Sequence, residues 1–383
     1  MGCFIIDNIL SIEDYQYLDD IGSHTEYKIK YIKEYVRKWL NVAVNKTNKI
    51  EFIDAMCNAG IYKNLEFSTS LEVIQIFNLY ALKYKNIEFC IYLNDNNAKR
   101  IEIYEKIIQK NNQKKCRNVK IHFDNLDVVN YLNKKKGEYS GYNNAMTLLY
   151  VDPYNFGIPN LISTITSFVS NVYCELIYNF FSSDIDRNAN NSFSKSHKQN
   201  IISEIKGFIE YYDPSQMNYL YVLKELQDSI KKTSNVKYSF AYQFRTNKNL
   251  PLYYILYFTP NIRGIELLKD TIWDVFEGDD NYYYKTRKID HLQQNLFGNT
   301  IKDENIFRHA EKAIKHLIEK NKYDDFSFKY LKTIVLEKTI LKEGQIINYI
   351  IKPLIKNNKI LKNNLVSSRN YKDDTYKWCE QYE

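Results

Sequence analysis

The residues with the most chemical content in this chain are Asp152, Pro153 and Tyr154, which follow the apolar run Met146–Val151. A carboxylate and a backbone carbonyl both accept hydrogen bonds from an amine, and a tyrosine ring stacks on a flat base. Such a group positions a nitrogen lone pair for reaction, and positioning dominates over proton transfer there. Two further candidates for substrate contact follow directly, Asn155 and Phe156.

A second candidate binding element is the segment IEFIDAMCNAG, residues 50–60. It has the pattern of a short buried strand that ends in Asp54, followed by a loop that closes on Gly60. Such a loop turns sharply and exposes backbone N–H groups to a ligand, which favours residues that tolerate positive φ. Many buried strands also end in Asp and a turn without binding anything. The candidate ligand contacts are Asp54, Met56, Cys57, Asn58 and Gly60.

Strands and helices alternate regularly between residues 50 and 179. Strands are expected at 50–54, 87–93, 119–123, 146–151 and 172–179, and helices at 70–83, 98–111, 128–136 and 161–169. This alternation predicts a mainly parallel sheet with right-handed crossovers and helices on both faces. Because the carboxyl ends of parallel strands meet at one edge, Asp54 and Asp152 are expected at the same ligand-binding edge.

The segments around this core predict a covering helix, an insertion and a hairpin. Residues 1–45 contain an amphipathic helix from about 24 to 44, on which His24 and Lys28 either gate a ligand or belong to a basic, solvated face. Residues 180–236 interrupt the alternation and are expected to form a substrate-binding insertion with a pair of helices. Runs at 238–245 and 253–259 predict an antiparallel hairpin, and a helix follows at 263–276.

The C-terminal part reads as a separate unit. We expect a first domain over 46–280, a linker over 281–303 and an α-rich domain over 304–383. Helices near 307–319, 328–335 and 343–357, with a ribbon at 360–365 and 375–378, follow the plan of a winged helix. This tail carries a net charge of about +5. Its lysines either contact nucleic acid or form a solvated helix face: Lys352, Lys356, Lys359 and Lys362.

Composition sets broad limits. A hydrophobic content of 44% over 383 residues is enough for a sizeable core, and a formal charge of +7 permits nucleic-acid binding without demanding it. The six cysteines form no CxxC pair, so neither a disulfide framework nor a metal site is expected, and a cytoplasmic location fits. No apolar stretch is long enough to span a bilayer, so no membrane partner is expected.

Seven strands with a terminal hairpin, and acidic or amide residues after the first four, resemble the class I S-adenosylmethionine-dependent methyltransferases. The resemblance implies a Rossmann-like α/β fold and S-adenosylmethionine as cofactor. It implies that the loop from Asp54 to Gly60 packs against the amino-acid end of the cofactor and that Asp54 holds its ammonium. Asn94 or Asp95 would bind the ribose, with Asn94 at the usual position, where an amide accepts fewer bonds than a carboxylate. Asp127 would accept from the adenine amino group, with Asp124 as the alternative.

The motifs DAMCNAGIY, YVDPYNFGIP, YCELIYNFFSSDIDRN and YYILYFTPNIRGIELLKDTIW resemble the three-Cys-motif partner proteins, a family of methyltransferase-like bacterial proteins. DNA adenine methyltransferases carry D/N-P-P-Y, whereas this chain has DPYN. Amino-group methyltransferases carry their catalytic signature at this position, and the resemblance to them implies that Asp152, Pro153 and Tyr154 are catalytic. Arg187 would contact a phosphate or carboxylate over the cofactor pocket, unless it pairs with Asp184 or Asp186.

Three functions follow as expectations. The first is methylation of an exocyclic amine of a nucleic-acid base, with the C-terminal domain gripping RNA or DNA. The second is a catalytically inactive methyltransferase fold that binds a partner protein or nucleic acid, which the Asn94 substitution favours. The third is methylation of a peptide or small molecule.

Overall fold

The computed structural model describes residues 9–111, 116–139, 145–185, 195–209, 213, 218–246, 248–283, 301–321, 324–363 and 374–379. The chain forms two compact units, Met1–Asn261 and Ile262–Glu383. The division falls before helix α9 (Ile262–Phe276), which the sequence analysis assigned to the first domain. Two buried hydrogen bonds explain the difference, because α9 binds the C-terminal unit: Lys269 Nζ donates to the Thr339 carbonyl (2.6 Å) and Trp273 Nε1 to the Ile340 carbonyl (2.8 Å).

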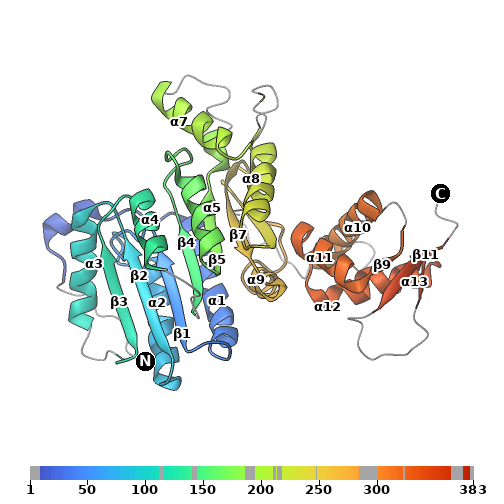
Figure 1. Ribbon diagram of the computed structural model, residues 1–383, viewed down its shortest axis with the longest axis horizontal. Coiled ribbons are helices and arrows are strands. Elements are labelled where there is room, and N and C mark those ends of the chain that lie inside the picture. Colours follow the sequence, from blue (N-terminus) through green and yellow to red (C-terminus); the bar gives the residue numbers. More distant parts are fainter. Residues whose placement is uncertain are drawn as a thin grey trace. The chain divides into compact units, whose positions relative to one another are not determined.

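The first unit contributes seven strands to a sheet, in the order β3-β2-β1-β4-β5-β7-β6 (Figure 1). The strands are β1 (Lys49–Asp54), β2 (Glu88–Asn94), β3 (Val119–Asp124), β4 (Met146–Val151), β5 (Cys174–Phe180), β6 (Tyr238–Arg245) and β7 (Pro251–Thr259). The first five strands are parallel, and β7 pairs antiparallel with both β5 and β6. The mainly parallel sheet and the terminal hairpin are therefore confirmed.

The helices of this unit cover both faces of the sheet, as expected. They are η1 (Ile12–Tyr17), α1 (Ser23–Ala43), α2 (Thr69–Lys83), α3 (Ala98–Asn111), α4 (Val128–Glu138), α5 (Leu161–Asn171), α7 (Lys195–Lys206) and α8 (Tyr219–Thr233). On one face α4, α5 and α8 pack on apolar side chains such as Ile53, Leu149 and Leu176. Because strand side chains alternate, Phe52, Glu175 and Tyr257 point to the opposite face, towards α1 and α2.

Helix α1 is held to the sheet by a buried polar cluster. The Glu175 carboxylate accepts hydrogen bonds from the Tyr35 hydroxyl on α1, from the Tyr257 hydroxyl (2.8 Å) and from Thr259 Oγ1 (3.1 Å). Burial raises the pKa of Glu175, and the three hydrogen bonds oppose that rise. The cluster matters for function because the same helix carries Lys28.

This cluster predicts a pH-dependent stability. A carboxyl whose pKa is raised in the folded state binds its proton more tightly there, so its contribution to stability falls as pH rises above the unfolded value of 4.5. Glu175→Gln keeps an acceptor and loses the charge. We expect the free energy of unfolding of the variant to increase relative to that of the parent as pH rises from 4.5 to neutrality. Urea unfolding of both proteins across this range measures the difference, and parallel pH profiles would contradict the prediction.

The second unit contains α9, β8 (Asn281–Tyr283), α10 (Ile301–Asn321), β9 (Phe326–Ser327), α11 (Phe328–Lys338), α12 (Glu343–Ile346), the π-helical turn η4 (Ile347–Ile351), α13 (Lys352–Lys356), β10 (Ile360–Lys362) and β11 (Thr375–Trp378). The expected ribbon is present, since β10 and β11 pair antiparallel, and β9 adds a third strand that the sequence analysis missed. The π turn precedes Pro353, whose ring has no N–H and clashes with a regular helix.

Three expected absences concern the described residues. None of their helices is long and apolar enough to cross a membrane. None of their His, Cys, Asp and Glu side chains forms a group of three or more that could hold a metal ion. The cysteines among them, Cys57, Cys90, Cys116, Cys174 and Cys379, carry free thiols.

Candidate functional site

The loop after β1 has the positive φ values that the sequence predicted. Asn58 and Gly60 adopt φ values of 59° and 82°, in the left-handed region. The Cys57 N–H donates to the Asn94 carbonyl (2.7 Å), and the Gly60 carbonyl accepts from the Ser68 N–H (2.8 Å) at the start of α2. A Cβ on Gly60 would lie 2.7 Å from the Tyr104 ring, so both the backbone conformation and the packing require glycine.

Asp54 ends β1 as a buried carboxyl, 2% exposed. Its Oδ1 accepts the Met56 N–H (3.2 Å). Burial raises the pKa of Asp54 to about 8, and the nearby charges of Asp152 and Asp95 add to the rise. Among the ion pairs of the described residues none includes Asp54, although the side chain lines a cleft. A buried carboxyl of this kind attracts a cation.

Asp152 lies in the same cleft and is firmly held. Its Oδ2 accepts from Lys28 Nζ (2.5 Å) and from the Tyr150 hydroxyl (2.7 Å), and its Oδ1 accepts from Asn179 Nδ2 (2.7 Å). Lys28 belongs to α1 and is 7% exposed, so the basic, solvated face considered for this lysine is wrong. The long side chain instead reaches the end of β4, past the Tyr253 ring.

The cleft has a volume of about 230 Å³ and opens at the carboxyl edge of the sheet. It brings together seven of the residues expected from the sequence: Asp54, Met56, Cys57, Asn58, Asp152, Pro153 and Tyr154. Asn179, at the end of β5, also lines it, and the sequence analysis missed this residue. A signal was available, because a polar residue lies near the end of β5, as Asp54 and Asn94 do at the ends of β1 and β2.

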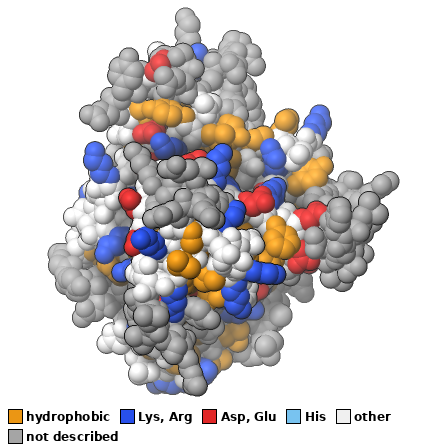
Figure 2. Space-filling model, turned by 90° about the vertical axis from the view of Figure 1, so that its right-hand side faces the viewer, with side chains coloured by type: hydrophobic (Ala, Val, Ile, Leu, Met, Phe, Trp, Pro, Cys, Tyr) orange, Lys and Arg blue, Asp and Glu red, His pale blue; other side chains and the backbone are white. Residues whose placement is uncertain are grey.

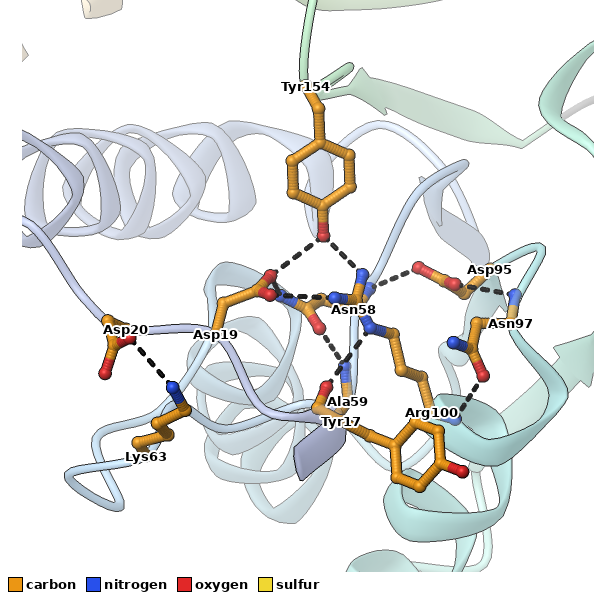
Figure 3. A network of polar contacts seen from close by, with 10 residues as sticks. All are labelled: Tyr17, Asp19, Asp20, Asn58, Ala59, Lys63, Asp95, Asn97, Arg100 and Tyr154. Atoms are coloured by element: carbon orange, nitrogen blue, oxygen red, sulfur yellow. Dashed lines mark hydrogen bonds and ion pairs between the residues drawn. The ribbon is translucent and has the colours of Figure 1, made fainter. Parts of the chain in front are cut away.

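Tyr154 joins a polar network that crosses from the β1 loop to α3 (Figure 3). Its hydroxyl accepts from Arg100 (2.5 Å) and donates to Asp19 Oδ2 (2.9 Å). Asp19 also accepts from Arg100 (2.7 Å) and from Asn58 Nδ2 (2.7 Å). The segment before α1 therefore ties three elements of the site together. Neither Asp19 nor Arg100 had been singled out, because nothing in their local sequence marks such a contact.

The two candidates for the ribose have partners within the chain. Asn94 is 1% exposed, and its amide nitrogen donates to the carbonyls of Ala55 and Leu126 (both 3.0 Å), while its Oδ1 accepts the Leu126 N–H (3.0 Å). Asp95 accepts the N–H groups of Asn58 (3.1 Å) and Asn97 (2.9 Å). Burial raises the pKa of Asp95. Asn94 thus joins the loops after β1 and β3, an arrangement that does not favour its expected role.

Of the two candidates for the adenine, Asp124 ends β3 and Asp127 follows the strand, and both lie outside the residues that line the cleft. Asp127 is the N-cap of α4 and accepts the Asn130 N–H (3.0 Å). Asp124 forms an ion pair with Lys134. Capping explains why an acid follows this strand, since it satisfies a free N–H at the helix start. The adenine contact of Asp127 stays a prediction.

The remaining expected contacts differ in their positions. Phe156 is 1% exposed and packs against Phe180, so it belongs to the core and its expected substrate contact is wrong. Asn155 is exposed outside the cleft lining. Asp184 accepts the Phe156 N–H (2.9 Å), whereas Arg187 lies outside the described residues. Lys352 and Lys356 are exposed on the second unit.

No protein-family model and no curated protein matches the sequence. Solved structures that are similar to this chain in fold include several methyltransferases. The Legionella pneumophila protein LPL1258 has 12% identity and a TM-score of 0.36, over 65% of this chain and 92% of its own. An S-adenosylmethionine-dependent methyltransferase from Agrobacterium tumefaciens has 12% identity and a TM-score of 0.35, over 63% of this chain and 64% of its own. Magnesium protoporphyrin IX methyltransferase from Synechocystis, with bound S-adenosylhomocysteine, has 13% identity and a TM-score of 0.30, over 60% of this chain and 82% of its own. At these scores the likeness concerns the fold alone.

Proposed function

We propose that the chain binds S-adenosylmethionine and methylates an amino group of a nucleic-acid base. The observation that carries the proposal is the pairing of two carboxyls in one cleft: Asp54, buried and without a cationic partner among the described residues, and Asp152, held at the end of β4. The first suits a ligand ammonium, and the second suits an N–H donor.

The amino-acid end of the cofactor fits the residues present. Asp54 offers a buried carboxyl that ionises when a ligand ammonium binds it, and the positive φ of Asn58 and Gly60 turns the loop backbone around it. At the ribose end, Asp95 keeps acceptor capacity beyond the two N–H groups it already binds, since a carboxylate accepts about four hydrogen bonds. Asp95 therefore replaces Asn94 as our candidate for the ribose.

S-adenosylmethionine, when bound, supplies a methyl group on a sulfonium. The chain's contribution is orientation of the acceptor. Asp152 accepts one N–H of the amine, and the Pro153 carbonyl is suited to accept another. Tyr154 is 57% exposed, so its ring has a free surface on which a flat base can stack. The sequence Asp152-Pro153-Tyr154, which resembles the catalytic signature of amino-group methyltransferases, supports this substrate class.

A second candidate is a binding module without catalysis. Two observations favour it. The Asn94 side chain hydrogen-bonds the backbone of the chain itself, and the Asp19 carboxylate accepts hydrogen bonds from Arg100 and Tyr154 across the site. In this case the fold serves a partner protein or a nucleic acid. The free thiols of the described residues fit a cytoplasmic location in both cases.

Calorimetry with S-adenosylmethionine tests the proposal. Because the pKa of Asp54 is about 8, the carboxyl releases a proton when a ligand ammonium binds it at neutral pH. We expect the affinity to rise with pH up to about 8, by up to about tenfold per unit, and the measured heat to vary with the ionisation enthalpy of the buffer. Asp54→Asn should abolish the proton release and weaken binding. The absence of binding by the parent at any pH would refute the proposal.

We further propose that the second unit is a winged helix that contacts nucleic acid. Its order of α10, β9, α11, the helix from α12 to α13, β10 and β11 supports this plan. Figure 2 shows one face of the molecule, on which lysine and arginine side chains are dispersed among apolar and acidic ones. Lys352 and Lys356 are exposed on α13, next to Lys359.

The lysines predict a salt dependence. On duplex DNA each phosphate contact contributes about 0.9 to the slope of log affinity against log salt concentration. Replacing Lys352, Lys356 and Lys359 with Gln should flatten this slope by about 2–3, without changing cofactor binding. The matched control replaces Lys312, Lys315 and Lys320 on α10, which removes the same charge elsewhere. Anisotropy titrations at several salt concentrations measure the slopes, and equal slopes for both triple variants would contradict the prediction.

A further inference from the structure

We propose that Lys28 is a positioning residue of this site: its ammonium fixes the Asp152 carboxylate in one orientation and balances its charge, which leaves Asp54 to hold a cationic ligand. The inference rests on the proposed function and adds a residue from α1 to it. Lys28 and Asp152 are 124 residues apart in sequence, and their Nζ and Oδ2 atoms lie 2.5 Å apart.

The first argument is the position of Lys28. Its side chain is 9% exposed, and its Nζ lies 5.7 Å from the centre of the Tyr253 ring. Removing an ammonium from water is costly unless a partner of opposite charge and good geometry replaces the lost solvation. A lysine on the exposed face of a helix keeps its ammonium in solvent, whereas the Lys28 ammonium contacts Asp152 at the end of β4.

The second argument is the direction of the remaining acceptor. Lys28 and Tyr150 occupy Oδ2 of Asp152, and Asn179 Nδ2 occupies one position on Oδ1. Since a carboxylate has about four acceptor positions, roughly one stays available, on Oδ1. The contact to Asp152 also orients the Asn179 amide, whose buried Oδ1 has no hydrogen-bond partner among the described residues. A primary amine has two N–H groups, so these two oxygens suit it.

The third argument is charge. Asp54 and Asp152 share the cleft, and the charge of the Asp152 carboxylate makes ionisation of Asp54 harder. The titratable groups that interact with Asp54 come from the loop, α3, α4 and the ends of β2 and β4: Cys57, Tyr62, Tyr104, Tyr131, Tyr150, Asp95 and Asp152. Burial raises the pKa of the thiol and of the four tyrosines, which keeps them neutral.

Asp95 and Asp152 are therefore the anions that oppose ionisation of Asp54. Lys28 offsets part of the second of these charges. His24, one turn earlier on α1, also lines the cleft, and burial together with Lys28 lowers its pKa, so it adds little charge at neutral pH. Lys28 is thus the cation that pairs with Asp152 among the described residues.

The experiment follows the affinity for S-adenosylmethionine, by calorimetry, from about pH 6 to pH 10 in the full chain and four variants. Each affinity is corrected for the fraction of ligand whose α-ammonium, with a pKa of about 8, is still protonated. Lys28→Met should move the midpoint of the pH dependence upward by about one unit, because Asp152 then acts unbalanced on Asp54. Lys28→Arg should keep the parental midpoint. The double variant Lys28→Met/Asp152→Asn should return to it, since both charges are gone. Lys33→Met, on the same helix but paired with Glu72, is the matched control.

Thermal unfolding of each variant separates this role from a structural one. A lower melting temperature of Lys28→Met with an unchanged midpoint would overturn the inference, and so would a double variant that keeps the shifted midpoint. Failure of the parent to bind S-adenosylmethionine would overturn the proposed function and this inference with it. Binding by the parent with no shift in Lys28→Met would overturn the inference alone.

Discussion

Asp152→Asn is expected to lower the rate of methyl transfer roughly a hundredfold or more, because an amide nitrogen or a misdirected oxygen no longer orients the acceptor amine. Cofactor binding should persist, since Asp152 contacts Lys28, Tyr150 and Asn179 and not the cofactor in our proposal. Its pH midpoint should move downward, because the Asp152 charge no longer opposes ionisation of Asp54. Transfer of a labelled methyl group from S-adenosylmethionine to bacterial RNA and DNA measures the rate.

The structure changes the design of this experiment. Asp152→Ala would leave the buried Lys28 ammonium unpaired, a loss that costs about 3–5 kcal/mol at buried ion pairs and so mixes folding with catalysis. Asparagine keeps an acceptor for Lys28. Asp228→Asn, on the exposed side of α8, removes one carboxylate elsewhere and serves as the control. An Asp152→Asn protein with the parental rate would rule out amino-group chemistry at this site.

Gly60→Val should lose S-adenosylmethionine binding and much of its stability together. A side chain at φ +82° costs of the order of 1–3 kcal/mol in backbone strain. Overpacking adds a similar amount, about 1–3 kcal/mol, because the new Cβ lies 2.7 Å from the buried Tyr104 ring. Tyr104 cannot move freely, since its hydroxyl donates to Ser70 (3.1 Å) in α2.

The comparison with Gly137→Ala makes this result specific. Gly137 lies in α4, and a Cβ at this position would meet no described atom within 4 Å. Alanine there should therefore be neutral or stabilising, by up to about 1 kcal/mol. Urea unfolding gives both stabilities, and calorimetry on the folded fraction gives the affinities. A Gly60→Val protein as stable as the parent would mean that the β1 loop tolerates a side chain, and unchanged affinity would place the cofactor elsewhere.

Much of the fold of the first unit could be predicted from local patterns. The expected helix at 98–111 coincides with α3 and the expected strand at 146–151 with β4, because burial of one face repeats every 3.6 residues in a helix and persists through a buried strand. The turn after β1 was also predictable, since few residues other than glycine and asparagine accept its φ values.

Short or irregular elements escaped these patterns. β9 has two residues, too few for any periodicity, and it exists because β11 pairs with it. The π turn before Pro353 adjusts a helix that the pattern alone describes as continuous. The boundary between the units was misplaced for a similar reason, because α9 is joined to its unit by contacts with Thr339 and Ile340, about seventy residues later in the chain.

Some residues of the candidate site could likewise be predicted from local patterns, and others could not. The types and spacing of residues identified Asp54 and Asp152, because strand ends collect at one edge of a parallel sheet. The amphipathic pattern assigned Lys28 to a helix face, and the motif assigned Phe156 to the substrate, but only folding brings Lys28 to Asp152 and buries Phe156 under Phe180. A local pattern reports how exposed a side chain is. Which group lies opposite depends on chain segments more than a hundred residues away, and their positions follow from the packing of the whole sheet.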